Sequence, residues 1–598
     1  MLKVGIGRIT KGAFSRVTPQ QQTLRPGQII QGKIVKLYPN NNAEILLGSQ
    51  KMIAQVKTPL TIGEKYHFQV QATDDILHLK VLGEQLKREE KVNIKHLLQQ
   101  LGLKTTKANV AMTESLINDK ISFDKNQLTQ AFDLLTGSKD KMLTKVVLKE
   151  MIAAKLPITD SVFQALFTHH TSGITERMKS LLAPLERSRT NVKLMGRLSQ
   201  MVDRPLDSKS TIIKQILTEN KHHNQQLFNL LKATGLVNMS IDFSTWQSQW
   251  EAFEERNNIT PTNIQNQLLN TALPFEMDSE RVVSILEQTI SNKMVLQRHS
   301  TEMLQLWENK LAKTSADPVL TEQEFTVLKQ QISQKITPLL SSELSAATIS
   351  KYNSVHAQQI LSILHTLTDK QGFADTEELL TKIKLDKLFL QAAPKEQFLA
   401  QLNQLLRFTG LAYENLLLHT DVEQQSATIK GMLLQILQKN DGTTNEPGQQ
   451  LLHFINGMQI NSVNEANHFI QVNLQIPGER MALNSDIELE FAGNKTRNGE
   501  IDPDYCRIVF YLDLTYLKQT VIDMNVHKRV VTVTIYNDVM EVNDQYASLQ
   551  PVLKKGLADL DYHLSGIVCK PLAQNTETKI SSSIKAIKST YQGVDYRI

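Results

Sequence analysis

The 598-residue sequence contains very little cysteine, with two residues in the whole chain. This scarcity excludes a disulfide scaffold and a cysteine-ligated structural zinc site. Long apolar runs are also missing, since no stretch approaches the length of about 18 residues that a transmembrane helix needs. The first residues, Met1 to Arg8, hold no apolar core of signal-peptide length. We therefore expect neither a membrane span nor Sec export.

Motifs of catalysis are missing as well, because the chain contains no P-loop, no HExxH and no GxSxG. The histidine pairs His169-His170 and His222-His223 are poor metal ligands, since adjacent side chains point to different helix faces, and we expect them to be exposed. The sequence favours a non-enzymatic protein without a metal or a cofactor. An enzyme whose site assembles from distant residues stays open as a third alternative.

Charge of each sign is concentrated at opposite ends of the chain. Residues 1–85 hold eight Lys and three Arg against five Asp and Glu, a net charge of +6. Residues 467–572 hold ten Lys and Arg against fourteen Asp and Glu, a net charge of −4. A basic head favours nucleic acid, an anionic surface or an acidic partner, although a solvated surface is the simpler explanation.

The N-terminal segment, 1–85, is predicted to be a small β-barrel of the OB-like kind. Five short alternating strands fall within about 60 residues, and so short a chain must close to hide its sheet edges. Tyr66 and Phe68 share one strand face and are expected inside the barrel. If the module binds nucleic acid, the candidate residues for stacking and for phosphate contacts are Lys33, Lys36, Lys51, Lys65 and Tyr38.

The middle of the chain is predicted to be helical, with helical hairpin repeats over 86–200 and further helices over 201–440. Residues 112–132 align with 147–167 at a spacing of 35, and Asp124 and Thr159 then occupy equivalent N-cap positions. Trp246, Trp250 and Phe253 share one helix face, which indicates core packing, with a groove-binding anchor as the alternative.

The period changes from helix to strand after a linker and short helix predicted over 441–466. Residues 467–572 are predicted to form a compact α+β module, and 573–598 a tail. The fold class that follows is a multidomain, mainly α protein with a small OB-like barrel in front, a long helical middle and a C-terminal α+β module.

Three runs in the C-terminal module resemble the core domain of flagellar hook-length control proteins: Tyr511–Leu517, Val521–Val526 and Val530–Ile535. The spaced leucines of the following helix and Leu564–Val568 are also similar to that family. The family carries Leu-Gly before its second strand and a turn glycine after it, where this chain has Leu517-Lys518 and no glycine between Val526 and Val530.

Three further runs resemble a Gram-positive subgroup of hook-length-control-like proteins. They are Leu24–Ile34, Arg407–Leu418 and Leu451–Gly457. The first is similar to the opening module of that subgroup.

The resemblance implies a function through contact rather than chemistry. In this family the C-terminal domain binds the cytoplasmic domain of the export-gate switch protein of the flagellar type III secretion apparatus and changes its substrate specificity. The residues expected to carry that protein–protein interaction are Tyr511, Asp513, Val521, Asp523 and Met524. The expected location is cytoplasmic, with export through the flagellar apparatus left open. The alternative function is a cytosolic scaffold or nucleic-acid-associated protein acting through the basic barrel.

Overall fold

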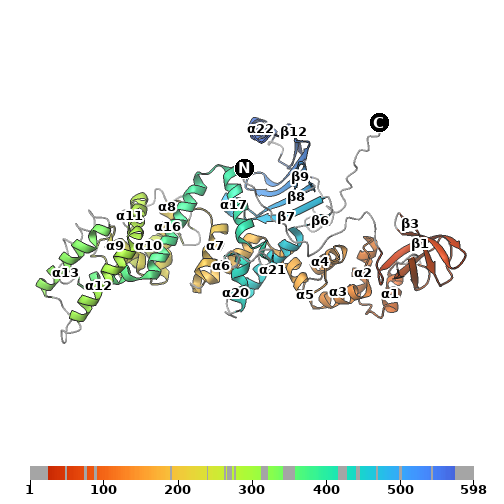
Figure 1. The fold of residues 1–598 in the computed structure, drawn as a ribbon, viewed down its shortest axis with the longest axis horizontal. Helices are drawn as coiled ribbons and strands as arrows, with labels where there is room; N and C mark the ends of the chain where they lie inside the picture. The colour runs from red at the N-terminus through yellow and green to blue at the C-terminus, as the bar shows by residue number, and fades with distance from the viewer. Residues whose placement is uncertain are drawn as a thin grey trace. The chain divides into compact units, whose positions relative to one another are not determined.

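The fold is taken from a computed structural model of the chain (Figure 1). It describes residues 24–572 apart from 48–49, 73–76, 87–89, 189–190, 239, 261–263, 265–272, 275–277, 312–320, 341–356, 415–426, 439–444, 463, 467–468, 497–500 and 540–542. Contacts divide the chain into two compact units, one formed by 1–203 with 399–598 and the other by 204–398.

Five strands close into a barrel in the order β1-β2-β3-β5-β4, which confirms the predicted OB-like fold. Side chains alternate between the inside and the outside, so Ile34, Ile45 and Phe68 are fully buried. Tyr66 is also inside, as predicted. The strands are β1 (Ile29–Tyr38), β2 (Asn42–Leu47), β3 (Gln50–Val56), β4 (Lys65–Ala72) and β5 (Leu77–Leu82).

The barrel is joined to the helices that follow it. The backbone N–H of Ile29 donates to the carbonyl of Phe123 at 2.7 Å. Ile29 and Leu82 belong to the same buried cluster as the helical residues Leu98, Leu116 and Phe123. The barrel and the first helices therefore share apolar contacts and are not separated by a free linker.

The repeat predicted in the helical segment is present, and its two copies match in detail. Lys120 and Lys155 occupy equivalent positions, and both have the left-handed backbone that ends a helix, at φ of 56° and 55°. Asp124 and Thr159 then cap the next helices by accepting from backbone N–H groups, as predicted. The helices are α1 (Glu90–Gln100), α2 (Lys107–Asn118), α3 (Lys125–Gly137), α4 (Lys141–Ala153) and α5 (Asp160–Thr171).

A central helix, α21 (Asn445–Ser462), packs against α5 and against α6 (Ile174–Ser188). Gly457 makes the crossing possible, because a Cβ there would overlap the carbonyl oxygen of Ala165 in α5. The ring of His169 stacks on Phe454 with centroids 5.2 Å apart. The same unit contains α7 (Val192–Val202), α20 (Ile429–Gln438) and the second half of α17 (Pro394–Phe408).

The unit formed by 204–398 is a helical bundle with its own core. Trp246, Trp250 and Phe253 are at most 1% exposed, which confirms the predicted core packing. They pack edge-on to one another, with ring centroids 5.2–5.7 Å apart. Its elements are α8 (Ser208–Lys221), α9 (Gln226–Ala233), α10 (Phe243–Asn257), α11 (Ser279–Ser291), α12 (Lys293–Leu311), α13 (Glu322–Lys335), η2 (Thr337–Leu339), α15 (Ala357–Thr368), α16 (Lys370–Gln391) and the start of α17.

The C-terminal module is a seven-stranded sheet in the order β12-β11-β10-β9-β8-β7-β6 (Figure 1). Helix α22 (Asn543–Ala558) connects β11 to β12, and this last pair is parallel. Leu553 and Leu557 of α22 pack against the apolar face of the sheet. The strands are β6 (Asn464–Ala466), β7 (Phe469–Ile476), β8 (Ile487–Lys495), β9 (Ile501–Leu514), β10 (Lys518–His527), β11 (Val530–Tyr536) and β12 (His563–Lys570), with η4 (Glu479–Met481) between β7 and β8.

The loop between β7 and β8 fastens this sheet to the helices. The carboxylate of Asp486 accepts from the backbone N–H of Thr175 at 3.1 Å and from its hydroxyl, at the N-terminus of α6. Buried Arg480 donates to the carbonyl of Asp203 at 3.3 Å. The module therefore belongs to the unit that contains the N-terminal helices.

Two expectations need correction. His169 and His170 are partly buried: His169 stacks on Phe454, and His170 lies 2.9 Å from the carboxylate of Glu150. The pair His222-His223 is exposed, as expected. The segment 441–466, expected to hold a linker and a short helix, contains the 18-residue helix α21. Taken as a whole, the predicted fold class is confirmed.

Candidate binding faces

All five barrel residues proposed for nucleic-acid contact lie on one outer face. The register pairs Lys65 with Lys33, Lys33 with Leu46, and Leu46 with Lys51, so a row runs across four neighbouring strands. The three lysines are exposed. We call Lys33, Lys51 and Lys65 the lysine row. Lys36 and Tyr38 lie beside it on β1, and Tyr38 is 41% exposed.

One carboxylate lies among these cations. Glu44 of β2 accepts from the hydroxyl of Tyr38 at 3.0 Å and pairs with Lys51 at 3.4 Å. The hydrogen bond to Glu44 raises the pKa of Tyr38, and the same bond lowers the pKa of Glu44. With Glu44 against Lys33, Lys36, Lys51 and Lys65, the face keeps a net charge of +3.

The C-terminal sheet brings four of the five predicted partner-binding residues to one face. The register pairs Tyr511 with Val521 directly, while Asp513 and Asp523 lie on the same face, two residues farther along β9 and β10. The opposite face packs against α22. Because side chains alternate along each strand, Met524 points to that opposite face, where it packs with the core. The four residues on one face form the candidate surface, and Met524 lies outside it.

The structure adds three charged residues that the sequence analysis did not single out. Glu488 pairs with Tyr511 in the register, Glu490 with Val509, and Arg507 with Asn525. We call this surface of β8, β9 and β10 the acidic face. Its charged residues are Glu488, Glu490, Asp513 and Asp523 against Arg507, a net of −3. The alternation of Glu488 and Glu490 with Ile487, Leu489 and Phe491 predicts that the two glutamates share one face of β8, but only the pairing of β8 with β9 places them beside Tyr511.

The centre of the acidic face is rigidly hydrogen-bonded. Arg507 donates two bonds to the carboxylate of Asp523, at 2.9 and 2.8 Å, and Asn525 donates to the same carboxylate at 3.1 Å. Bidentate pairs of this kind fix the orientation of both groups. Burial raises the pKa of Glu490, which shares a hydrogen bond with Tyr511, and burial also raises the pKa of Tyr511.

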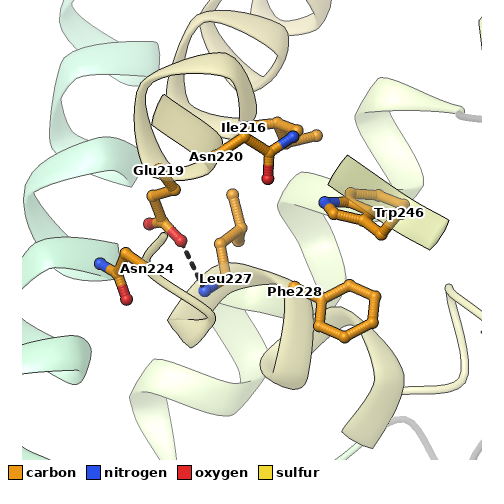
Figure 2. Close-up of a pocket in the computed structure, with 7 residues that line it drawn as sticks. All are labelled: Ile216, Glu219, Asn220, Asn224, Leu227, Phe228 and Trp246. Atoms are coloured by element: carbon orange, nitrogen blue, oxygen red, sulfur yellow. Dashed lines mark hydrogen bonds between the residues drawn. The ribbon is translucent and has the colours of Figure 1, made fainter. Parts of the chain in front are cut away.

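The helical bundle contains a small recess beside α8 and α9 (Figure 2). It is lined by Ile216, Glu219, Asn220, Asn224, Leu227, Phe228 and Trp246, and it has no internal space for even a water molecule. Ligand pockets usually measure roughly 300–1,000 Å³. The Glu219 carboxylate accepts from the backbone N–H of Leu227 at 2.9 Å, at the start of α9. Its role is therefore to cap a helix.

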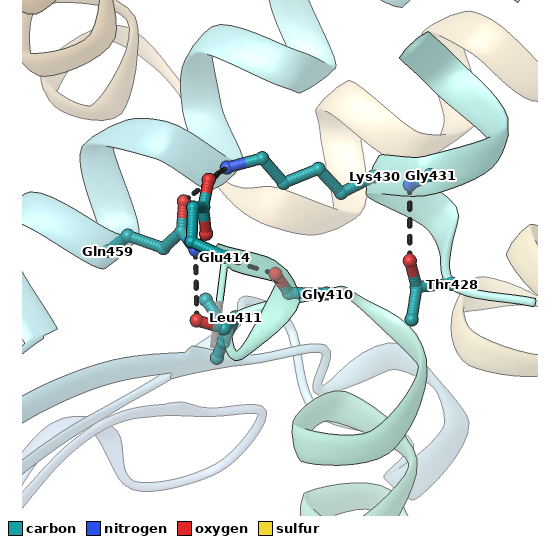
Figure 3. Close-up of polar contacts among 7 residues, drawn as sticks. All are labelled: Gly410, Leu411, Glu414, Thr428, Lys430, Gly431 and Gln459. Atoms are coloured by element: carbon teal, nitrogen blue, oxygen red, sulfur yellow. Dashed lines mark hydrogen bonds and ion pairs between the residues drawn. The ribbon is translucent and has the colours of Figure 1, made fainter. Parts of the chain in front are cut away.

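A second polar cluster connects one run that carries the family resemblance, Arg407–Leu418, to helix α21 (Figure 3). Lys430 is 5% exposed and donates to Glu414 and, at 2.6 Å, to Gln459 of α21. Gln459 in turn donates to the carbonyl of Leu411 at 2.9 Å. Burial raises the pKa of Glu414, but the charge of Lys430 and the hydrogen bonds from Lys430, Gln459 and the backbone together lower it by more. This network ties the turn after α17 to α21; residues 415–418 of that run lie outside the described residues.

Among the residues that the structure describes, no group of three or more His, Cys, Asp or Glu side chains is placed to hold a metal ion. No helix in that part of the chain is long and apolar enough to cross a membrane.

Comparison with known proteins agrees with the barrel and adds a full-length relative. Residues 10–80 match the family model of the TP0910 S1-like domain. The chain is 23% identical over 607 residues to "Uncharacterized protein YlqG" of Bacillus subtilis (strain 168), with 98% of each chain covered. No solved structure matches the chain. The N-terminal module is thus similar to S1-like domains, and the whole chain is similar to YlqG.

Proposed function

We propose that this chain is a non-enzymatic, hook-length-control-like protein whose C-terminal module binds the cytoplasmic domain of a type III export-gate switch protein. One observation carries the proposal: Tyr511, Asp513, Val521 and Asp523, taken from the family resemblance, lie together on the face of the sheet opposite to α22. Tyr511, Asp513 and Val521 are partly exposed there, whereas Asp523 is only 8% exposed and lies beneath them as a supporting residue. The other face packs against α22. An antiparallel sheet with one packed face commonly has its polar face in contact with solvent, where a partner could reach it.

The backbone of the module also supports the resemblance. The family's Leu-Gly is Leu517-Lys518 here, and Lys518 has the left-handed φ of 56° that glycine favours. At the missing turn glycine, Lys528 and Arg529 have φ of 48° and 62°, as a tight two-residue hairpin requires. The chain therefore keeps the conformations for which the family uses glycine.

Co-elution of two purified proteins tests this function. The full chain is mixed with the cytoplasmic domain of the same organism's switch protein and run on a size-exclusion column. We expect one complex with the unmodified chain and none with Asp513→Arg. Val552→Asp is the matched control, because Val552 is 69% exposed and belongs to α22, which packs on the opposite face of the sheet. Separate elution of the unmodified proteins would contradict the proposal.

A second candidate function is nucleic-acid binding by the barrel, and the lysine row favours it. OB-folds bind oligonucleotides across the strand 2 and strand 3 surface, and Lys51 of β3 and Leu46 of β2 lie there. Titration of the full chain with a single-stranded RNA oligonucleotide at several salt concentrations tests it. The affinity is expected to fall steeply with salt, with a slope of about −0.7 per neutralised phosphate. A salt-independent affinity, or one unchanged by Lys33→Glu, rules out phosphate contact by the row.

A further inference from the structure

We propose that the lysine row of one copy of this chain docks on the acidic face of a second copy. The two surfaces are complementary in charge, since the barrel face carries +3 and the sheet face −3. This self-association does not depend on the proposed switch-protein contact, although both contacts use the acidic face.

The two surfaces are also similar in size and form. The lysine row crosses four adjacent strands, which at about 4.8 Å per strand spacing spans roughly 14 Å. The acidic face crosses β8, β9 and β10, which spans roughly 10 Å at the same spacing. Long lysine side chains reach sideways over such a difference. Both surfaces are parts of β-sheets, so neighbouring strands have the same spacing in each.

Each surface holds a less polar centre between its charges. On the barrel, Leu46 is partly exposed between Lys33 and Lys51. On the sheet, Val521 and Tyr511 are partly exposed and pair in the register next to Glu488. Contact between these centres would bury apolar atoms within a ring of ion pairs, which is the usual composition of a protein interface.

The contact joins two different surfaces, so it is heterologous. A pair of copies would keep one lysine row free on one copy and one acidic face free on the other, so assembly would continue beyond two copies. Exposed ion pairs contribute only about 0.2–1 kcal/mol each, so the association is expected to be weak and sensitive to salt. Screening is strong at 1 M salt, where the Debye length is about 3 Å, and weak at 0.01 M, where it is about 30 Å.

Sedimentation velocity of the full chain tests the inference without any partner protein. We expect the average mass to rise with protein concentration at low salt and to return to that of the monomer at high salt. The variant Lys33→Glu/Lys65→Glu and the variant Glu488→Lys/Asp513→Lys should each remain monomeric at low salt. Mixing the two variants should restore association, because each then supplies the surface that the other lacks.

A matched control is Lys554→Glu/Lys555→Glu on α22, which makes the same change in net charge at exposed positions away from both surfaces. It should associate like the unmodified chain. A chain that is monomeric at every salt concentration would overturn the inference. Association that survives reversal of the lysine row would overturn it equally. Neither result bears on co-elution with the switch protein, so the two proposals fail separately.

Discussion

Single residues in this chain hold backbone conformations that usually require glycine. Lys120, Lys155, Lys518, Lys528 and Arg529 all have φ between 48° and 62°. A residue with a Cβ pays about 1–2 kcal/mol in this region relative to the right-handed helix. The repeat of this feature at Lys120 and Lys155 shows that the left-handed position belongs to the helical hairpin itself. Glycine at such positions is therefore expected to stabilise the fold.

The clearest site for that prediction is the hairpin between β10 and β11. Lys528→Gly should raise the stability of the C-terminal module by about 0.5–1 kcal/mol. Glycine removes the strain of the left-handed backbone, and the greater conformational entropy of glycine in the unfolded chain offsets part of that gain. The control, Lys555→Gly in α22, should lower stability by about 1 kcal/mol, because that residue is helical. Amide hydrogen exchange of β10, β11 and α22 measures both. An unchanged or lower protection for Lys528→Gly would contradict the account of the turn.

A buried histidine makes the barrel sensitive to acid. His67 of β4 is 3% exposed, and burial lowers its pKa to about 4 from 6.5. Below pH 6.5 the unfolded chain binds a proton that the folded barrel does not, so stability falls between pH 6.5 and pH 4. The full loss is about 3 kcal/mol, of which about 2 kcal/mol has accumulated at pH 5.

The test compares amide exchange of β1–β5 at pH 7 and pH 5, after correction for intrinsic rates. The variant His67→Gln should lose much of the acid sensitivity, whereas His222→Gln, at an exposed position, should keep it. Equal acid sensitivity in the two variants would show that His67 is not its source.

Among the elements, α21 determines how the helices of its unit pack. Gly457→Ala should destabilise that unit by about 1–3 kcal/mol, because the new methyl group forces α21 away from the Ala165 backbone of α5. Gly448→Ala in the same helix is the matched control. Its Cβ would meet Leu437 at 3.5 Å, an ordinary contact, and alanine favours the helix. Thermal unfolding midpoints that fall equally for both variants would contradict the close crossing.

The elements show which features a sequence reveals and which it does not. The barrel and the hairpin repeats follow from alternation, spacing and capping residues, all of which are local. Helix α21 was underestimated because Pro447 and Gly448 suggest a break. Proline is tolerated in the first helical turn, where its missing N–H has no helical partner, so the helix begins at Asn445. The partial burial of His169 depends on contact with Phe454, 285 residues away, and no local pattern predicts it.

For the whole molecule, function depends on which residues share a face, and that is set by strand register. Alternation along β10 places Met524 on the face opposite to Val521 and Asp523, so the sequence alone predicts that Met524 lies outside the candidate surface. The addition of Glu488, Glu490 and Arg507 to the same surface was not predictable from the sequence, because it needs the pairing of β8 with β9 and of β9 with β10. The attachment of the module by Asp486 and Arg480 also links residues far apart in the chain.

This attachment has a consequence for experiments on the whole molecule. Asp486 caps α6, and its carboxylate would be left without the N–H of Thr175 if the module were cut out. Residues 461–598 expressed alone would also lose the packing of β7 against α21. The full chain is therefore the proper reagent for binding studies, with single substitutions in place of truncation.

The most direct test is a calorimetric titration of the full chain with the cytoplasmic domain of the same organism's export-gate switch protein. The account predicts saturable one-to-one binding, at least tenfold weaker with Tyr511→Ala or Asp513→Arg and unchanged with Val552→Asp. Tenfold corresponds to about 1.4 kcal/mol, the loss expected when one well-packed interface residue is removed. No heat of binding at high micromolar concentration, or equal binding by all of these variants, would contradict the central claim.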